Sequence, residues 1–391
     1  MPAQDIHIIG AGIAGLTTAL ALARNGRKVV IVDQAPALSE VGAGLQMSPN
    51  ASRILIALGL GAALDKAIAR PERISLISGN SLRRIAHVPC GAFAARRWGA
   101  PYGVLHRADL QTMLLEAVKA HPRCHLKLGQ RIETAELQAL QKANATTASP
   151  LVIGADGVWS QTRQLIAGAA RPRFSGQVAW RFKVDAERAR TLLDPANVSV
   201  FLAPRTHLVA YPLEGGRSIN MVAITHGKDP GETWAADENP TARSDLLAAF
   251  RDWDPKVRDI LEDTPHMSWW PLFEMPDGRW FDDDHTMLIG DAAHAMTPFA
   301  AQGAAMAIED GYELAQALTA DDGDQRTALQ RYESNRRARI SKARKRAAFN
   351  QFAYHARGPI RLGRNIILAM RRPESLAADL DWLYGYRANG S

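Results

Sequence analysis

Cysteine is scarce in this chain, and long apolar runs are missing. Only Cys90 and Cys124 are present, without C-x-x-C spacing, so the sequence indicates neither a disulfide framework nor a zinc or other metal site. No apolar run approaches the ~18 residues that span a bilayer. The N-terminal MPAQDIHIIG also lacks the basic flank and cleavage site of a signal peptide. We therefore expect a cytoplasmic protein without integral membrane association.

A large excess of charge of one sign is missing as well. The 391 residues include 47 Lys and Arg against 40 Asp and Glu, which gives a net charge of +7. Basic residues gather in residues 331–346, RYESNRRARISKARKR, a run more typical of a solvated helix face than of a binding patch. Because no recognition-helix, zinc-finger or aromatic RNA-binding motif accompanies this run, we expect no nucleic-acid partner. The modest positive field favours anionic small molecules.

What the chain does contain is a strand–turn–helix–strand unit near its start. Residues 5–33 read DIHIIGAGIAGLTTALALARNGRKVVIVD, with glycines in G-x-G-x-x-G order. Such a turn lets the pyrophosphate of a dinucleotide approach the backbone and the helix N-terminus. Asp33 stands near the offset at which an acid meets a ribose hydroxyl. The alternative is an α/β unit that keeps its glycines for packing only. The predicted cofactor contacts in this unit are Gly10, Ala11, Gly12, Ile13, Ala14, Gly15, Asp33 and Gln34.

The order of patterns along the chain predicts an α/β fold: a Rossmann-like nucleotide-binding domain interleaved with an antiparallel-sheet domain and followed by a helical C-terminal region. Period-two stretches predict the antiparallel sheet. Residues 234–271 are expected to be helical, and residues 133–149 are expected to form a helix that fades into a loop. The predicted boundaries are 1–72, 99–172 and 276–330 for the nucleotide-binding domain, 73–98 and 173–275 for the substrate-binding sheet with its helices, and 331–391 for the C-terminal region.

Two further stretches place an acid directly after a short buried strand. One is DGVWSQTR at 156–163, which follows LVIGA, and the other is MLIGD at 287–291, which precedes AAHAMTPFAAQGAAMAIEDG. In α/β proteins ligands bind at the carboxyl ends of the strands, so Asp156 and Asp291 are candidate cofactor contacts. Alternatively, Asp291 caps a helix that begins near Ala292. A helix opened by the small residues Gly303, Ala304 and Ala305 would place its N-terminal N–H groups beside a planar ring.

These stretches, together with HRADL at 106–110, resemble the single-component (group A) FAD-dependent aromatic hydroxylases, the family of salicylate and hydroxybenzoate hydroxylases. The resemblance runs essentially end to end, including a terminal WLYGY. It implies that GAGIAG binds the ADP part of FAD and that Asp156 touches both the flavin and the pyridine nucleotide. It further implies that Asp291 contacts the ribityl chain and Arg107 the FAD. In this chain Asp33 replaces the commoner Glu, and residues 133–149 lack the alternating strands usual before the D-G motif.

The resemblance also implies an activity, that of an oxidoreductase of aromatic hydrocarbon catabolism. NADH or NADPH would reduce FAD, O₂ would form a flavin C4a-hydroperoxide, and its distal oxygen would hydroxylate a small aromatic or heteroaromatic acid. One alternative is a flavin-dependent reductase or dehydrogenase without oxygen transfer, and another is a nucleotide-binding regulator that uses the basic helix. The substrate, the ring position, the nicotinamide preference, any decarboxylation and the choice between monomer and homodimer stay open at this point.

Candidate catalytic residues lie in the predicted strand HLVAYP at 207–212. Side chains alternate along a strand, so His207, Val209 and Tyr211 share one face. A His and a Tyr there would hold the ring hydroxyl of an aromatic acid and favour its phenolate form; an ordinary half-buried pair is the equal alternative. Further predicted substrate contacts are Arg181, Pro298 and Phe299. His294 is predicted to be structural.

Overall fold

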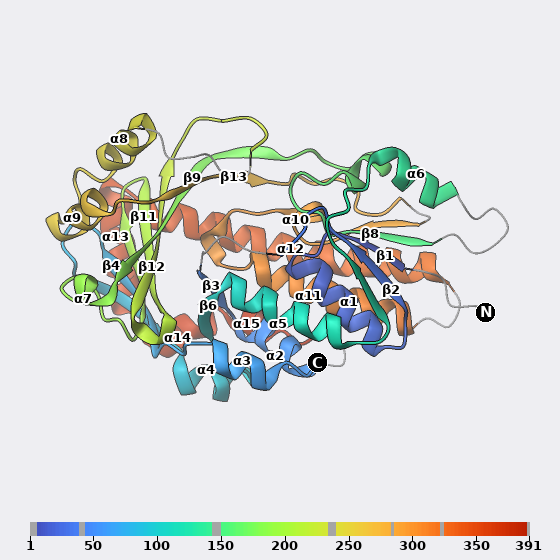
Figure 1. Cartoon of the computed structure of the whole chain (residues 1–391). Helices are drawn as coiled ribbons and strands as arrows, with labels where there is room; N and C mark the ends of the chain where they lie inside the picture. The colour runs from blue at the N-terminus through green and yellow to red at the C-terminus, as the bar shows by residue number, and fades with distance from the viewer. Residues whose placement is uncertain are drawn as a thin grey trace.

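Two sheets of different type lie towards opposite ends of the molecule (Figure 1). The computed structural model describes residues 6–38, 44–142, 150–233, 240–282, 285–320 and 324–388. Within these ranges, five strands form one sheet, seven form a second, and two short strands, β3 (Gly44–Met47) and β6 (Gly103–His106), pair with each other. This arrangement confirms the predicted α/β fold class with an interleaved antiparallel sheet.

The five-stranded sheet is parallel and has the order β14-β8-β1-β2-β7. A parallel strand that is covered on both faces needs a continuous apolar run, and the sequence supplies one in each central strand. Because β1 pairs with both β2 and β8, Ile9 lies beside Val32 and Gly154, so the carboxyl ends of these strands meet at one edge. The strands are β1 (Ile6–Ile9), β2 (Val29–Val32), β7 (Cys124–Lys127), β8 (Leu151–Gly154) and β14 (Thr286–Leu288).

Helix α1 (Ile13–Arg24) lies at the centre of this part and is buried from Ile13 to Ala23. It packs against α5 (Arg107–Ala120) and α11 (Gly303–Ala320). The crossing with α11 is close, because a Cβ on Gly311 would lie 2.6 Å from Thr18 Oγ1. The other helices of this part are α2 (Pro49–Ala57), α3 (Gly61–Ala67), α4 (Gly91–Trp98), α6 (Thr134–Lys142) and α10 (Asp291–His294).

The seven-stranded sheet has the order β13-β9-β12-β11-β10-β4-β5 and is antiparallel except where β10 runs parallel to β4. One face packs on α8 (Pro240–Ala249) and α9 (Pro255–Asp263) around Phe201, Trp253 and Leu261, and the other face belongs to the core shared with the parallel sheet. The strands are β4 (Arg73–Ser78), β5 (Arg84–Pro89), β9 (Arg173–Asp185), β10 (Val198–Ala203), β11 (Thr206–Leu213), β12 (Ser218–His226) and β13 (Ser268–Glu274).

One local expectation is wrong. Residues 234–271 were expected to be helical, yet Ser268–Glu274 forms β13, an edge strand that pairs with β9. The physical reason is tertiary: strand β9 offers free backbone groups, and pairing with them overrides local propensity. The helical prediction holds for α8 and α9, and residues 234–239 lie outside the described ranges. In the 133–149 stretch, α6 matches the expected helix, and residues 143–149 also lie outside them.

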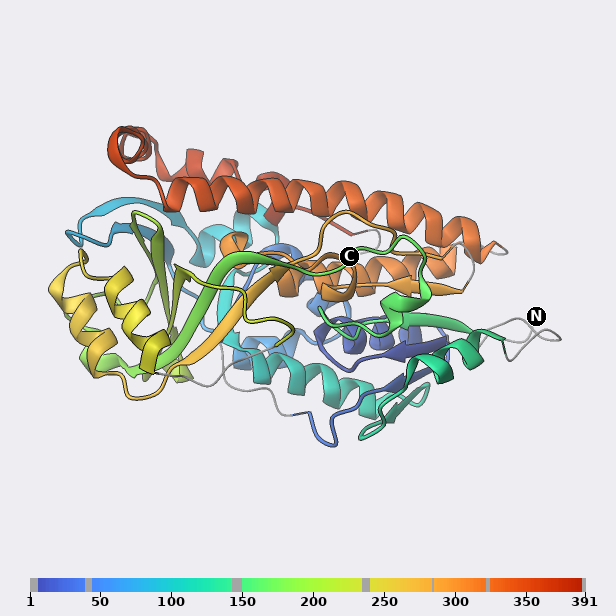
Figure 2. The same cartoon turned by 90° about the horizontal axis from the view of Figure 1, so that it is seen from above.

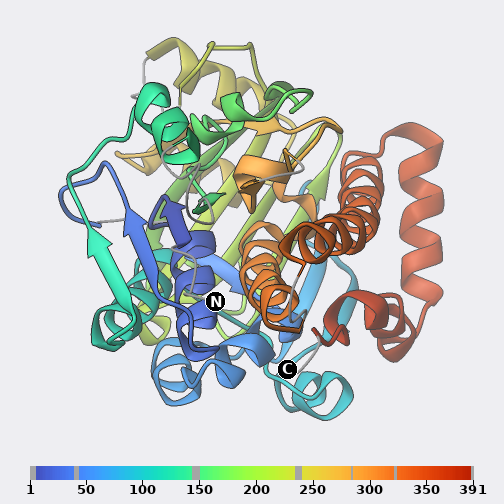
Figure 3. The same ribbon diagram turned by 90° about the vertical axis from the view of Figure 1, so that its right-hand side faces the viewer.

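The C-terminal region is helical, as predicted. Helix α12 (Gln325–Tyr354) runs along one side of the molecule from the parallel sheet to the seven-stranded sheet (Figure 2). Helix α13 (Gly358–Met370) then stands at the outside, and α14 (Pro373–Ala378) and α15 (Asp381–Tyr384) return the chain towards α2 (Figure 3). All strands of the two large sheets fall within the segments assigned to their respective domains, and we keep the predicted boundaries as a proposal.

Candidate active site

The turn between β1 and α1 uses its three glycines for different reasons. Gly10 has φ +103°, and a Cβ there would lie 2.5 Å from the Ala155 carbonyl oxygen; a Cβ on Gly15 would lie 1.9 Å from the Gly10 oxygen. Protein packing therefore requires these two glycines. A Cβ on Gly12, however, would lie more than 4 Å from every described residue except its chain neighbours, and its φ of −74° suits any residue. Packing alone does not explain the glycine at this position, whereas a group bound against the backbone does.

Asp33 and the helix that begins at Arg107 both contact this turn. The Asp33 carboxylate accepts hydrogen bonds from the Ala11 N–H at 2.6 Å and from the Ala35 N–H at 2.8 Å, while the neighbouring Gln34 is exposed. Arg107 is the first residue of α5. One turn later, the Gln111 side chain donates to the Ala11 carbonyl at 3.4 Å. Gln111 was missed by the sequence reasoning, although its i, i+4 spacing from Arg107 puts both on one helix face.

Asp156 follows β8 and holds its own loop in shape. Its Oδ2 accepts from the N–H groups of Gln161 and Thr162, at 2.9 and 3.0 Å, and from the Thr162 hydroxyl. Its Oδ1 is buried without a partner among the described residues. Because an unpaired buried acceptor is costly, this oxygen is suited to a donor from a bound group. The loop lies against the glycine turn, since a Cβ on Gly10 would also lie 3.0 Å from Asp156 Cα.

Arg163, the last residue of the D-G-x-x-S-x-x-R stretch, ties the two acid-bearing loops together. Its guanidinium donates to the carbonyls of Val158 at 2.9 Å and of Ala292 at 2.8 Å. Burial lowers the pKa of Arg163, and the nearby Asp156 opposes that shift. The sequence marked Arg163 as part of a motif, but its partner Ala292 lies far along the chain and could not be foreseen.

Asp291 begins α10 and points away from the protein interior. Gly290 is the N-cap residue of this helix, Asp291 is exposed, and its side chain makes no hydrogen bond to a described residue. The alternative in which Asp291 serves as a helix cap is therefore wrong. The N-terminus of α11 is equally accessible, since a Cβ on Gly303 would meet nothing within 4 Å. Gln302, just before it, is buried and donates to the Ser48 hydroxyl at 3.1 Å, which fixes where the helix begins.

A buried cluster of charged residues contacts the turn before Asp291 from the protein interior. Asp310 on α11 accepts from the Gly290 N–H at 2.8 Å, pairs with His294 and accepts from Arg336 Nε at 2.8 Å. Burial by itself favours the neutral acid, but His294 and Arg336 lower the pKa of Asp310 to about 2. Arg336 is fully buried and also bonds Glu309 at 2.7 Å. The cluster holds His294 in the interior, in keeping with its predicted structural role, and makes the turn rigid.

His207 and Tyr211 share the face of β11 that looks towards the parallel-sheet part. The His207 ring packs on Phe299 at 5.0 Å between ring centroids, and Tyr211 lies against β3, since a Cβ on Gly44 would lie 2.5 Å from Tyr211 Cε2. Both side chains are buried. Four residues of strand separate their Cα atoms by about 13 Å. The two groups therefore suit opposite ends of an aromatic acid and not one hydroxyl.

The other predicted substrate contacts lie around the same face. Arg181 on β9 is in register with Val222, which pairs with Val209, and its guanidinium stacks over Trp270 at 5.0 Å. Burial raises the pKa of the Tyr211 phenol, and Arg181 opposes that shift. Pro298 and Phe299 form a short 3₁₀ turn before α11, in which Pro298 is exposed and Phe299 is buried. The structure therefore brings these residues near His207 and Tyr211, and their role as substrate contacts stays a prediction.

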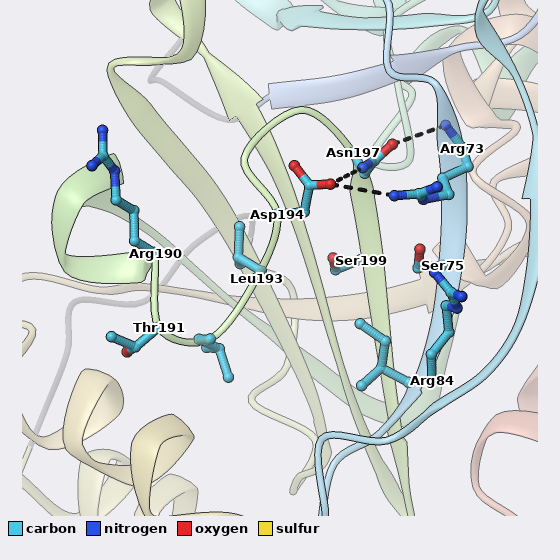
Figure 4. A pocket seen from close by; sticks show the side chains of 11 residues that line it. Arg73, Ser75, Arg84, Arg190, Thr191, Leu193, Asp194, Asn197 and Ser199 are labelled. Atoms are coloured by element: carbon cyan, nitrogen blue, oxygen red, sulfur yellow. Dashed lines mark hydrogen bonds and ion pairs between the residues drawn. The ribbon is translucent and has the colours of Figure 1, made fainter.

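A polar cavity of about 390 Å³ lies elsewhere (Figure 4). Arg73 and Ser75 on β4, Ser199 on β10 and Asp194 in the preceding loop line it. Side chains alternate along these strands, so the cavity opens on the opposite face of the sheet from Tyr211. Asp194 there already pairs with Arg73 at 3.4 Å and with Asn197 at 2.5 Å. None of the predicted site residues lines this cavity.

The chain matches a known protein family over most of its length. Residues 3–347 match the family described as "FAD binding domain". The chain belongs to this family. It is 35% identical to the 3-hydroxybenzoate 6-hydroxylase of Polaromonas naphthalenivorans, across 97% of this chain and 96% of that protein. It is 31% identical to the 6-hydroxynicotinate 3-monooxygenase of Bordetella bronchiseptica, across 87% of this chain and 89% of that protein.

Solved structures of low sequence identity share the fold. A salicylate hydroxylase substrate complex superposes with a TM-score of 0.79 at 22% identity, covering 99% of this chain and 96% of that one. The predicted family and the FAD cofactor are confirmed by the family match and the named relatives. The glycine turn as the place where FAD binds stays a prediction. Within the part of the chain that the structure describes, no helix combines the length and apolar character of a membrane span.

Proposed function

We propose that this protein is an FAD-dependent monooxygenase that uses NADH or NADPH and O₂ to hydroxylate a small aromatic or heteroaromatic acid. The observation that carries the cofactor part of the proposal is the open space at Gly12, which packing leaves unexplained. Curated relatives, named as hydroxylases or monooxygenases of hydroxybenzoates and hydroxynicotinate, support the enzyme class. We place the protein in the cytoplasm, as a monomer or a homodimer.

The cofactor would be held by groups that the structure leaves accessible. The glycine turn, Asp33 and Arg107 suit the ADP part, while Asp291 and the N-terminus of α11 suit the ribityl chain and the flavin ring. The free Oδ1 of Asp156 suits a donor on the cofactor. Bound FAD would supply the redox chemistry, hydride acceptance and activation of O₂. The protein itself supplies position, exclusion of water and a proton acceptor.

His207 is the candidate proton acceptor. Burial and the neighbouring His355 lower the pKa of His207, so the imidazole is neutral near pH 7 and one nitrogen carries a lone pair. A ring hydroxyl that gives its proton to this nitrogen becomes a phenolate, which makes the ring a better nucleophile. Tyr211, whose pKa burial raises, keeps its phenolic proton and can donate it to the carboxylate at the other end of the substrate.

The proposal is tested by substrate-dependent oxygen transfer. We expect hydroxybenzoates, aminohydroxybenzoates or hydroxynicotinates to stimulate NADH or NADPH oxidation by the FAD-loaded protein about tenfold or more, because gating by a filled pocket prevents wasteful turnover. Under ¹⁸O₂, mass spectrometry should find one labelled oxygen in the product. Oxidation without label in any product would support the reductase alternative. Salt-dependent DNA binding without turnover would support the regulator.

Substitution of Tyr211 by Phe tests the proposed substrate contact of the Tyr211 hydroxyl. Tyr211→Phe keeps the ring packed against Gly44 and removes only the hydroxyl. We expect kcat/KM to fall roughly 10- to 100-fold, because a hydrogen bond to a charged group contributes about 1.5–3 kcal/mol. The flavin spectrum and FAD affinity should be unchanged. Tyr312→Phe, on α11 and away from Tyr211, is the matched control. Equal kinetics of both variants and wild type would mean that β11 has only a structural role.

A further inference from the structure

His207 is joined to a second histidine that the proposed reaction does not yet use. His207 Nδ1 lies 2.9 Å from Nε2 of His355, the residue that ends α12. The two rings are 5.1 Å apart between centroids. His207 is only 3% exposed, whereas His355 is half-buried. The pair therefore runs from the inside of the site to its outer edge.

The position of His355 is fixed from several elements. Its backbone N–H donates to the Gln351 carbonyl at 3.1 Å, and its carbonyl accepts from the Arg205 N–H at 3.3 Å. Arg364 on α13 donates to the carbonyls of Ala353 and Tyr354, at 2.6 and 3.3 Å, and so caps the end of α12. These contacts fix the backbone of His355, and its ring is thereby kept in contact with His207.

Both rings are neutral around pH 7. Burial lowers the pKa of His355 to about 4, with His226 as a further cause. His226 on β12 lies 6.4 Å from the His355 ring, and Tyr354 on α12 lies 5.4 Å from the His207 ring, between ring centroids. The guanidinium of Arg364 on α13 donates to the Tyr354 carbonyl, next to His355. Burial and His226 disfavour a positive charge on His355. A single proton is thus shared across the 2.9 Å contact.

Burial decides where that proton sits. His207 Nε2 makes no hydrogen bond to a described residue, and the side chain is only 3% exposed, so packing leaves this nitrogen little contact with solvent. A buried N–H without a partner is rarer and more costly than a buried acceptor. The favoured tautomer of His207 therefore carries its proton on Nδ1, donates it to His355 Nε2, and leaves Nε2 as a lone pair towards the site. His355 then keeps its own proton on Nδ1, at the half-exposed side.

We infer that His355 is a positioning and proton-relay residue, which sets the tautomer of His207 and passes the substrate proton to solvent. The inference rests on the proposed function. The substrate O–H bond breaks and its proton binds His207 Nε2. The Nδ1 proton of His207 moves to His355 Nε2, and the Nδ1 proton of His355 leaves to water. One proton has then travelled from substrate to solvent, and both histidines end neutral.

The first test needs no substrate. In ¹⁵N-histidine-labelled, FAD-loaded protein, nitrogen chemical shifts report the tautomer of each ring. We expect an Nδ1–H signal for His207 in the wild type and its loss in His355→Phe, which keeps a ring but cannot accept a hydrogen bond. His266→Phe, at an exposed histidine, should leave the His207 signal unchanged. An Nε2–H tautomer of His207 in the wild type, or an unchanged signal in His355→Phe, would overturn the inference.

The second test is kinetic. His355→Ala should lower the rate of hydroxylation about 10- to 100-fold while substrate Kd and FAD content stay near wild type, and free imidazole should restore part of the rate. His355→Asn, which can accept the hydrogen bond but not relay a proton, should keep the tautomer yet stay slow; it also serves if the alanine variant does not fold. Wild-type rates in both variants would overturn the relay. If no aromatic acid stimulates even the wild type, the proposed function fails, and the tautomer test still stands alone.

Discussion

The Gly12→Val variant is expected to fold and to lose FAD. Apart from its chain neighbours, no described residue lies within 4 Å of the position that a Cβ on Gly12 would occupy, so the side chain costs the apo fold little. Overlap with a pyrophosphate at the turn should weaken FAD binding by about 100-fold or more, which corresponds to about 3 kcal/mol. Flavin absorbance after reconstitution and unfolding in urea measure the two effects separately.

Two matched substitutions sharpen this result. Gly15→Ala should unfold the protein at lower urea, because its Cβ would lie 1.9 Å from the Gly10 oxygen. Gly363→Val also faces open space, but on α13 far from the turn, and should retain FAD. If Gly12→Val holds FAD as tightly as the wild type, the cofactor does not lie against this turn.

Replacing Arg336 with Met should destabilise the protein strongly. Arg336 is fully buried and pairs with Asp310 at 2.8 Å, Glu309 at 2.7 Å and Glu313 at 3.3 Å. Removing it leaves uncompensated charges in the interior, and we expect a loss of about 3–5 kcal/mol in the free energy of unfolding. Urea unfolding measures this loss. Asp310→Asn in the same chain should recover part of it, because one buried charge is removed.

A surface pair provides the comparison. Arg188 and Asp263 form an ion pair with half-exposed side chains, and Arg188→Met should change stability by at most about 1 kcal/mol.

The stability that the Asp310 ion pair contributes depends on pH with a definite sign. The folded-state pKa of Asp310 is about 2, below the value near 4 of an unfolded chain. Its contribution is therefore complete above about pH 4 and disappears as the pH falls towards 2. An Arg336→Met variant as stable as Arg188→Met would mean that the carboxylates are neutralised some other way.

The sequence alone determined the features that depend on near neighbours. An apolar run buried on both faces forms a parallel strand, and glycines at fixed spacing form a turn, because both follow from local backbone sterics and burial. The positions of Asp33, Asp156 and Asp291 at the ends of strands follow in the same way, as does the shared face of His207 and Tyr211. The family resemblance supplied the cofactor, which local pattern by itself left open between a bound dinucleotide and simple packing.

Tertiary structure alone decided which distant residues meet. Arg163 reaches Ala292 across 129 positions, and His207 reaches His355 across 148. The edge strand β13 formed where a helix was expected, since the backbone groups of β9 were available to it. The roughly 13 Å between the Cα atoms of His207 and Tyr211 underlies our proposal that they contact different ends of a substrate. Hydrogen bonds between elements depend on how whole helices and sheets pack, and a local periodicity carries no information about that packing.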